Sequence, residues 1–600
     1  MRKEFRELAS VEEATEVTEE LTPERRTEEV PLRQARGRVL AEGVDSPVDV
    51  PGFDRSLMDG YAVRAEDTYG ADEADPVTLT VVGTVSAGEP PETVVREREA
   101  AEIATGAPIP DGADAVVPVE ETTADGDVVH VRKALAPSDS IMFAGSDVAA
   151  GERALRSGTE LSQREIGLTA AVGRQKVSVY ARPRVGVVST GDELVRPGGR
   201  LKPGQIYDVN SFSVAAAVEE VGGEAVLYDH VGDDYDRMVS VMREAAEECD
   251  LVLSSGSTSA SDEDVVYRVI EEEGELITHG VALKPGRPTV FGRVDGTAFV
   301  GLPGNPISAL SVFRVFVEDM IRSSAGDGGD GRRTRQAKVA DEIRLDGGRT
   351  RLLPVGLVEE GGGVLAYSVD KGSGATTSLT RADGIVRAEA STNYLDEGEA
   401  VDVELFGDAS PPELLGAGER DGFLNGLLQG FDARWLPAGS FDGARLLRDG
   451  VADVAAVGTA ENTAEAVGVD AARVRGYERQ VGYVGDPGGE VFGVLPEGYA
   501  VRSRFGDEHP DAEVRVFRSE RGAANAVESG KVDGALVGED VAAETEAGFE
   551  ESGWMHIDIL VTEDRRGKEG VVSFLDGLGG ATPPDGYRVT DDTGDWVTRD

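Results

Sequence analysis

Acidic, hydroxyl and glycine residues gather at the end of an apolar segment near the middle of the chain. The apolar string RVGVVS ends in Ser189, and Thr190, Gly191, Asp192 and Glu193 follow it. Two adjacent carboxylates suit a hard cation that prefers oxygen ligands, such as Mg²⁺. Small residues let backbone N–H groups approach a phosphate at the start of a helix. This segment is therefore a candidate metal-and-phosphate site.

Similar residues follow three later apolar segments, and a basic pair lies among them. Lys284 and Arg287, in the string KPGRP, suit an anion because both side chains pair with phosphate oxygens. Each feature alone is also explained by a helix cap or a solvated turn. Together, at the ends of neighbouring strands, they would all face one crevice. The further candidates are Asp233 after the second segment, Ser255, Gly256, Ser257, Ser259 and Asp264 after the third, and Pro303, Gly304 and Asn305 after the last.

The elements that must position these residues alternate between strands and helices. The strings RVGVVST, EAVLYDHVG, DLVLSSG and GTAFVGLPG have the length and composition of strands. Amphipathic segments at 210–221, 235–249, 264–273 and 307–321 separate or follow them and predict helices. Such alternation predicts a doubly wound parallel sheet with helices on both faces. Ligands bind beyond the carboxyl ends of the strands in these sheets.

The rest of the chain divides by pattern into further domains. Residues 4–40 have helical periodicity broken by Pro23 and Pro31, and residues 47–144 consist of short alternating runs typical of strands. We predict a multidomain α/β plus β protein. Its parts are a helical N-terminal segment at 1–46 with a return at 145–180, a β-rich domain at 47–144, the α/β domain at 181–328, a small β-barrel at 329–407, a linker at 408–418 and a C-terminal α/β domain at 419–600.

The C-terminal domain contains a weak internal sequence repeat. A Ser/Gly turn, a helix and an apolar strand run from Ser440 to Gly458, and the same order recurs from Ser519 to Gly538. Two similar units suggest two lobes, although chance similarity in an Ala/Gly/Val-rich segment would also produce the pattern. Ser440 and Ser519 are either ligand contacts or simple N-caps.

Composition excludes several classes of protein. The net charge is −53, from 113 Asp+Glu and 60 Lys+Arg, and such a surface repels nucleic acid and anionic lipid. Normal hydrophobic content argues against an acidic disordered protein and favours the solvated surface of a halophile. The sequence predicts no membrane span and no signal peptide, and one cysteine, Cys249, excludes a disulfide framework. We therefore expect a cytoplasmic protein.

Several strings then identify a family. The chain resembles the molybdopterin molybdenumtransferases, the MoeA family that includes the E domain of gephyrin, in order from the N-terminus to about Phe406. The resemblance implies a dimeric, Mg²⁺-dependent enzyme that takes adenylated molybdopterin and molybdate and releases molybdenum cofactor and AMP. It implies a site shared between the α/β domain of one subunit and the β-rich domain of the other. The strings are PGFDRSLMDGYAVR, ATGAPIPDGADAVVPVE, VVSTGDELV, GQIYDVNS, KPGRP and GLPGNPISAL.

The resemblance also carries roles onto particular positions. Lys284 and Arg287 match a basic pair, although the second position is commonly lysine. The loop at 256–261, GSTSAS, departs from the more usual Gly-Gly-Val-Ser-x-Gly pattern, so its phosphate or pterin contacts are open. The matching acidic and hydroxyl positions are Asp59, Thr105 and Asp147, together with Glu193, Asp233 and Asp264, of which Asp59, Glu193 and Asp264 are the expected metal ligands.

Other interpretations remain beside the transferase. The C-terminal domain resembles periplasmic-type binding domains fused to some archaeal relatives, which allows a molybdate- or tungstate-sensing or scaffold protein with a vestigial site. The enzyme of the adenylating step has a similar α/β domain, but the strings FDRSLMDGYAVR and TGAPIP argue against it. That adenylyltransferase is instead a possible partner protein. Molybdate and tungstate remain equal candidates for the oxyanion.

Overall fold

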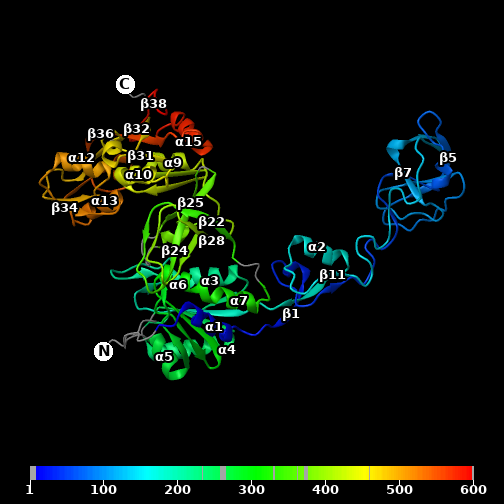
Figure 1. Ribbon diagram of the computed structural model, residues 1–600, viewed down its shortest axis with the longest axis horizontal. Helices are drawn as coiled ribbons and strands as arrows, with labels where there is room; N and C mark the ends of the chain where they lie inside the picture. Colours follow the sequence, from blue (N-terminus) through cyan, green and yellow to red (C-terminus); the bar gives the residue numbers. More distant parts are fainter. Residues whose placement is uncertain are drawn as a thin grey trace. The chain divides into compact units, whose positions relative to one another are not determined.

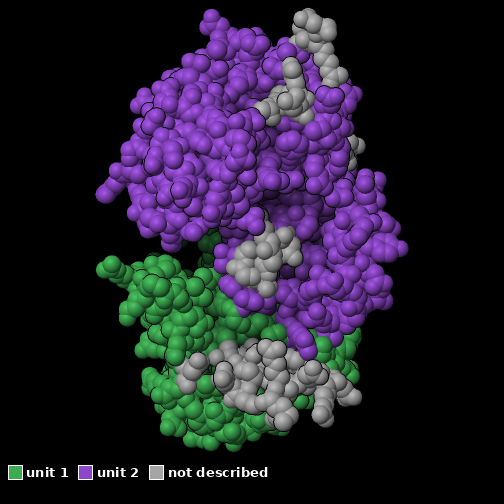
Figure 2. Space-filling model, turned by 90° about the vertical axis from the view of Figure 1, so that its left-hand side faces the viewer, with its two compact units in different colours: residues 1–281, 288–304, 312–330 green, residues 282–287, 305–311, 331–600 purple. Residues whose placement is uncertain are grey.

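The structure is a computed structural model (Figure 1). Its contacts divide the chain into two compact units, which Figure 2 shows in different colours. The first contains residues 1–281, 288–304 and 312–330, and the second contains 282–287, 305–311 and 331–600. No helix among the described residues is long and apolar enough to cross a membrane. The described residues are 8–232, 234–256, 265–328, 332–360, 362–369, 376–458 and 460–597, without the side chains of 360 and 460–462.

A six-stranded sheet in the order β16-β13-β17-β21-β20-β18 forms the centre of the α/β domain. Its first four strands are parallel, so their carboxyl ends meet at one edge, as the sequence predicts. Strand β20 is antiparallel to both of its neighbours, β21 and β18, which corrects the expectation of a wholly parallel sheet. The strands are β13 (Arg184–Ser189), β16 (Glu224–Leu227), β17 (Leu251–Ser255), β18 (Glu275–His279), β20 (Val290–Val294) and β21 (Thr297–Leu302).

Amphipathic helices pack on this sheet because their apolar faces are buried against its valines and phenylalanine. Met238, Val241 and Ile270 join Val252 and Phe299 in one core cluster. The segment predicted as a helix at 307–321 is continuous but contains a π-helical stretch, η4 (Phe313–Val317). The helices are α3 (Asn210–Glu220), α4 (Tyr235–Glu248), α5 (Val265–Glu273), α6 (Pro306–Val312) and α7 (Glu318–Ser324).

The N-terminal segment is helical over a shorter stretch than its periodicity predicts. Helix α1 (Val11–Leu21) begins at a capping box in which Ser10 and Glu13 bond each other's backbone N–H groups. The chain then forms strands that pair with the return segment, so the prediction of a helix over 4–40 is wrong beyond Leu21. The remaining elements are β1 (Thr27–Pro31) with β12 (Lys176–Tyr180), β2 (Val44–Asp45) with β11 (Arg153–Leu155), η1 (Leu32–Gln34) and α2 (Gln163–Ala171).

Residues 47–144 contain a second six-stranded sheet, in the order β7-β4-β6-β5-β9-β8. Gly60 opens β4 beside β7, where a Cβ atom would lie 1.8 Å from the Val117 carbonyl oxygen. Only glycine allows this approach, and it fixes the turn that carries Asp59. The elements are β3 (Arg55–Ser56), β4 (Gly60–Val63), η2 (Ala65–Thr68), β5 (Val77–Val85), β6 (Glu99–Ile103), β7 (Ala115–Pro118), η3 (Val119–Glu121), β8 (Thr122–Asp125), β9 (Val128–Val131) and β10 (Ile141–Met142).

The second unit begins with a curled sheet that closes on itself, because β24 pairs with both β25 and β26. Short strand β19 adds to β24 and carries Lys284. The elements are β19 (Leu283–Lys284), β22 (Thr334–Val339), β23 (Ile343–Arg344), β24 (Thr350–Glu360), β25 (Gly363–Ser368), α8 (Thr377–Arg381), β26 (Gly384–Ala388), β27 (Tyr394–Leu395) and β28 (Ala400–Leu405).

The C-terminal extension is built on one sheet in the order β30-β29-β31-β36-β32-β35-β33-β34. Long antiparallel strands β32 and β36 run through its middle, with three parallel strands on either side. The elements are β29 (Leu414–Gly418), α9 (Gly422–Leu428), β30 (Ala433–Pro437), α10 (Gly439–Arg448), β31 (Val454–Val457), α11 (Ala460–Val467), β32 (Ala471–Gly485), β33 (Val491–Val494), α12 (Ala500–Glu508), β34 (Glu513–Val516), α13 (Glu520–Glu528), β35 (Gly534–Gly538), α14 (Glu539–Ala542), β36 (Phe549–Thr562), α15 (Glu569–Gly579), β37 (Tyr587–Arg588) and β38 (Trp596–Val597).

The predicted linker at 408–418 is wrong at its carboxyl end. Residues Leu414–Gly418 form β29, a fully buried strand between β30 and β31. The curled sheet and the extension also share an apolar cluster, in which Val358 and Tyr367 meet Leu415 and Val451. They are therefore joined by packing as well as by the chain.

Candidate active site at the strand ends

Three turns at the carboxyl ends of β13, β17 and β21 are tied together by hydrogen bonds. The Thr190 N–H donates to the Ser255 carbonyl at 2.9 Å, and the Gly256 N–H donates to the Leu302 carbonyl at 3.2 Å. The Asn210 amide donates to the Ser255 hydroxyl and to the Gly304 carbonyl, both at 2.7 Å. Gly256 has a φ of +102° and packs against Thr190, where a Cβ atom would lie 2.6 Å from the Thr190 carbonyl oxygen. Of the residues predicted at these ends, Thr190, Ser255, Gly256 and Gly304 are thus connected in one cluster.

The turn after β13 is acidic, as its sequence predicts. Gly191 has a φ of +137°, and a Cβ atom there would lie 2.5 Å from a carboxylate oxygen of the exposed Glu193. A Cβ atom on Gly232 would lie 2.2 Å from an oxygen of Asp192. Both carboxylates thus fold over glycine turns, and small strands β14 (Leu194–Val195) and β15 (Ile206–Tyr207) follow.

A buried polar network supports this turn from below. The Ser189 hydroxyl contacts the Ser211 hydroxyl at 2.6 Å and donates to Asp208 at 3.1 Å. Asp208 also accepts from the Ser211 backbone and hydroxyl, at 3.0 and 2.6 Å. Asn210 is buried as well, and its side-chain oxygen Oδ1 has no hydrogen-bond partner among the described residues. Asp208, Asn210 and Ser211 lie in the string GQIYDVNS but were not predicted as site residues.

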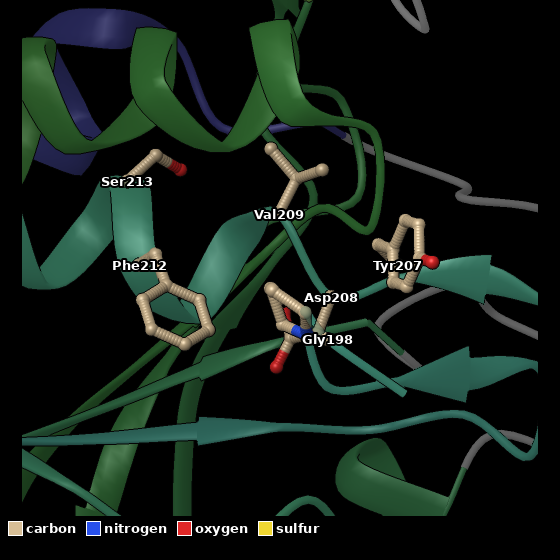
Figure 3. Close-up of a pocket in the computed structure, with 7 residues that line it drawn as sticks. Gly198, Tyr207, Asp208, Val209, Phe212 and Ser213 are labelled. Carbon is tan, nitrogen blue, oxygen red and sulfur yellow. The ribbon is translucent and has the colours of Figure 1, made fainter. Parts of the chain in front are cut away.

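A hollow of about 610 Å³ adjoins this network (Figure 3). Phe212 and Ser213 reach it from the start of α3, and Tyr207 reaches it from β15. Val209 also lines it, and Val209, Tyr207 and Phe212 are 39–49% exposed. Asp208 belongs to both features, since it lines the hollow while its carboxylate holds Ser189 and Ser211.

The basic pair lies in the second unit. Lys284, at the end of β19, forms an ion pair with Asp346 at 2.6 Å, and this ammonium group lowers the pKa of the exposed Asp346. Arg351 contacts the same carboxylate at 3.3 Å. Arg287 is exposed and interacts with other residues of the protein. Lys284 is therefore paired with an exposed carboxylate.

Asp59 and Thr105 form a second small cluster in the β-rich domain. One Asp59 oxygen accepts from the Thr105 N–H at 2.7 Å and from its hydroxyl at 2.9 Å. These two bonds lower the pKa of the Asp59 carboxyl. Asp147 is exposed, and its backbone N–H donates to the Val50 carbonyl at 3.0 Å. Within the described chain, none of these three residues is hydrogen-bonded to the strand-end cluster.

The other predicted positions lie either at these strand ends or outside the described residues. Ser189, Thr190, Gly191, Ser255 and Gly256 lie in the cluster. Pro303 and Gly304 are at its third turn, and Asn305 stands at the start of α6. Asp233, Ser257, Ser259 and Asp264 lie outside the described residues.

Three family models match successive parts of the chain. The MoeA N-terminal region (domain I and II) matches residues 9–173, a probable molybdopterin binding domain matches 186–323, and the MoeA C-terminal region (domain IV) matches 336–406. Molybdopterin molybdenumtransferase 2 of Mycobacterium tuberculosis is 39% identical over 60% of this chain and 90% of its own. The enzyme of a Nostoc species is 38% identical over 50% of this chain and 70% of its own.

A solved structure supports the same grouping. The molybdopterin biosynthesis MoeA protein of Pyrococcus horikoshii is similar over 67% of this chain and all of its own, with 39% identity and a TM-score of 0.59. Fold and strand-end cluster thus define a multidomain protein built around a molybdopterin-binding type of α/β domain. The chain belongs to the MoeA family, whose curated members named above are molybdopterin molybdenumtransferases. Residues after 406 lie outside the three family matches.

Proposed function

We propose that this protein is a molybdopterin molybdenumtransferase, which takes adenylated molybdopterin and molybdate or tungstate and releases the metal cofactor and AMP. The observation that carries the proposal is the strand-end cluster, where acidic and glycine turns of three parallel strands are locked together by Ser255 and Asn210. The 39% identity with a named enzyme supports the same activity.

The roles of the residues follow from their chemistry. Backbone N–H groups around Gly191, Gly256 and Gly304 suit the phosphates of the adenylate, because glycine allows close approach. Lys284 and Arg287 suit the oxyanion or the phosphate. A molybdate oxygen is the proposed attacking group on the phosphoanhydride: it bonds to the phosphorus of the molybdopterin phosphate, and the bond to the adenylate breaks so that AMP is the leaving group. The assignments for Asp147, Asp233, Ser257, Ser259 and Asp264 follow from the family resemblance.

We also propose a divalent cation, Mg²⁺, as the cofactor. Mg²⁺ suits such a site because it commonly takes one or two carboxylates and completes its shell with water and substrate phosphates. Asp59, Glu193 and Asp264 are the proposed ligands. When bound, the ion would neutralise charge on the phosphate oxygens as the anhydride breaks.

A homodimer with shared sites is part of the proposal. Apolar side chains are exposed beside both halves of the predicted site: Phe53, Leu57 and Met58 near Asp59 are 47–50% exposed. In the α/β domain, Ile206, Tyr207, Val209 and Phe212 are exposed too. Groups of exposed apolar side chains are typical of interaction sites. The cytoplasm is the proposed location, and the molybdopterin adenylyltransferase is a proposed partner.

For the extension we propose a two-lobed, binding-protein-like domain. Its two sets of three parallel strands flank the shared strands β32 and β36, as two similar lobes require. Ser519 is an N-cap that accepts from the Gly522 N–H at 3.0 Å. Ser440 instead contacts a buried carboxylate, so the two serines play different roles.

The test of the proposed activity is an assay of AMP release. Purified protein with adenylated molybdopterin and Mg²⁺ should release AMP when molybdate or tungstate is added. Reactions without oxyanion, and with sulfate in its place, are the controls. Binding of adenylated molybdopterin with no oxyanion-dependent AMP in either reaction would leave a binding or scaffold protein as the better description.

We propose further that the acidic surface is adapted to high salt. The net charge of −53 makes self-repulsion strong in dilute buffer, where the screening length is about 30 Å at 0.01 M. The melting temperature should therefore rise by several degrees between dilute buffer and molar KCl. Screening weakens the exposed ion pairs and acts in the opposite direction, so the sign of the shift is informative. An unchanged or falling midpoint would contradict the proposal.

A further inference from the structure

The strand ends of the two proposed lobes meet at a buried carboxylate. Glu419 directly follows β29 in the first lobe and is only 6% exposed. Ser440, in the first turn of α10, and Ala500, the first residue of α12, are 2% and 4% exposed. Helix α10 follows β30 of the first lobe, whereas α12 follows β33 of the second lobe. Glu419 and Ser440 therefore belong to the first lobe, and Ala500 belongs to the second.

One oxygen of Glu419 collects three hydrogen bonds at this point. It accepts from the Ser440 N–H at 3.0 Å, from the Ser440 hydroxyl at 2.7 Å and from the Ala500 N–H at 2.9 Å. The Ser440 hydroxyl in turn accepts from the Gly458 N–H at 3.0 Å. The first turn of a helix carries partial positive charge and free N–H groups, which favour an anion. The carboxylate thus occupies the start of two helices at once.

Further contacts close the lobes around this carboxylate. The Phe441 N–H donates to the Gly498 carbonyl at 3.2 Å, and the Gly422 N–H donates to Asp540 at 3.3 Å. A Cβ atom on Gly458 would lie 2.1 Å from the Ala500 Cβ. The two sides are therefore in direct contact here.

The neighbouring charged side chains also have partners of their own. Arg479 is 3% exposed and binds Glu520 at 2.8 Å and Asp540 at 2.8 Å. Asp421 accepts from the Tyr477 hydroxyl at 2.7 Å. Burial raises the pKa of the Glu419 carboxyl, while its bonds from Ser440 and Ala500 act to lower it. The N–H and O–H donors, together with the charge of Arg479, thus offset part of the cost of burying Glu419.

We propose that the strand ends of the two lobes form a carboxylate-binding site, and that its occupant is the chain's own Glu419. The inference rests on the proposed two-lobed architecture and is independent of the transferase activity. Glu419 does for this domain what an external ligand does for an open two-lobed protein, because it bridges both lobes. The extension therefore remains closed without a ligand, and a small carboxylate binds there only when the Glu419 side chain is removed.

The experiment uses the full-length chain with the substitution Glu419→Ala, which deletes atoms equivalent to one acetate ion. Acetate should raise the melting temperature of this variant by a few degrees in a saturable manner, relative to chloride at equal ionic strength. The unaltered protein should show no such shift. Glu490→Ala, which removes an exposed carboxylate from the same domain, is the matched control and should also show none.

Hydrogen exchange provides a second measurement that does not depend on the stability of one variant. The Ala500 N–H should be protected in the unaltered protein and in Glu419→Gln, because the carboxamide oxygen can still accept its bond. It should lose protection in Glu419→Ala and regain it with acetate. Equal exchange in all three proteins would overturn the proposal. A saturable rise in the melting temperature of the unaltered protein with acetate would overturn it too, because the site would then be open.

Discussion

Replacement of Glu193 by glutamine should nearly abolish oxyanion-dependent AMP release while leaving the fold intact. Within the described chain, the Glu193 side chain is exposed and makes no hydrogen bond or ion pair. An isosteric neutral side chain therefore removes a charge without breaking a structural contact. Loss of a proposed metal ligand costs several kcal/mol of transition-state stabilisation, which corresponds to a rate loss on the order of 100-fold or more. Single-turnover AMP release is the measurement.

Asp59→Asn provides a matched variant from the other half of the proposed site. Its carboxamide oxygen can still accept the two bonds from Thr105, so the turn should persist. If each site combines Asp59 of one subunit with Glu193 of the other, mixing and re-associating the two inactive variants should restore about a quarter of the unaltered rate. The reason is that half of the dimers are then mixed, and each mixed dimer has one complete site.

The outcomes separate three explanations. Full activity of both single variants would remove Glu193 and Asp59 from the site. Inactive variants that fail to complement, although the subunits exchange, would place both residues in one subunit's site. An exposed acidic residue away from the cluster, such as Glu244→Gln, should retain the unaltered rate and controls for the loss of charge itself.

The sequence predicts the strand-end cluster because its signals are local. Each of Ser189, Ser255 and Pro303 directly follows or ends an apolar run, and parallel pairing brings those ends together. The antiparallel strands β18 and β20 were not predicted. Only ten residues separate His279 from Val290, too few for a helical crossover, so that spacing could have indicated the change of direction.

Glycine explains why the sequence predicts a linker where the structure has strand β29. The string LLGAG has the composition of a flexible connection, but its glycines serve close packing. A Cβ atom on Gly416 would lie 2.0 Å from the Trp435 ring, and one on Gly418 would lie 2.2 Å from the Ala456 carbonyl oxygen. Their partners are distant in sequence, so composition alone cannot distinguish a buried strand from a linker here.

The contact between Glu419 and Ala500 cannot be predicted from the sequence for the same reason. Its partner Ala500 lies 81 residues away, and the contact is to a backbone N–H group that any residue could supply. The internal sequence repeat that contains Ser440 and Ser519 does not predict this contact either. Only Ser440 lies beside a buried carboxylate, whereas Ser519 caps its own helix. Repeated sequence patterns predict repeated elements but not which copy contacts another lobe.

Removal of the extension after Phe406 should destabilise the curled sheet that remains. The sequence predicts an independent unit behind a linker, so truncation would be harmless. The structure instead buries Leu365, Tyr367 and Val369 in a cluster with Leu415 and Val451 of the extension. Arg565, 5% exposed, also donates to the Glu359 carbonyl at 2.7 Å. The truncated chain should therefore melt several degrees lower, bind apolar dyes and aggregate.

A single ion pair allows the same interface to be tested in the full-length chain. Arg434, in β30, binds both oxygens of the buried Asp383 at 2.7 Å and contacts the Tyr367 hydroxyl at 3.2 Å. Arg434→Met leaves that carboxylate buried without its cation, which should cost about 3 kcal/mol of unfolding free energy. Calorimetric and denaturant unfolding at fixed salt would measure the loss.

The controls follow from the same argument. Arg445→Met removes an exposed partner of Asp442, where both side chains are more than half exposed, and should cost less than about 1 kcal/mol. The double variant Arg434→Met with Asp383→Asn should recover much of the loss, because no unpaired charge is left and the carboxamide oxygen can still accept from the Leu357 N–H. Equal stabilities of the Arg434 and Arg445 variants, together with a truncated chain that melts at the unaltered temperature, would show that the extension is a tethered and independent domain. A selective loss at Arg434 would instead show that the extension stabilises the curled sheet that carries Lys284.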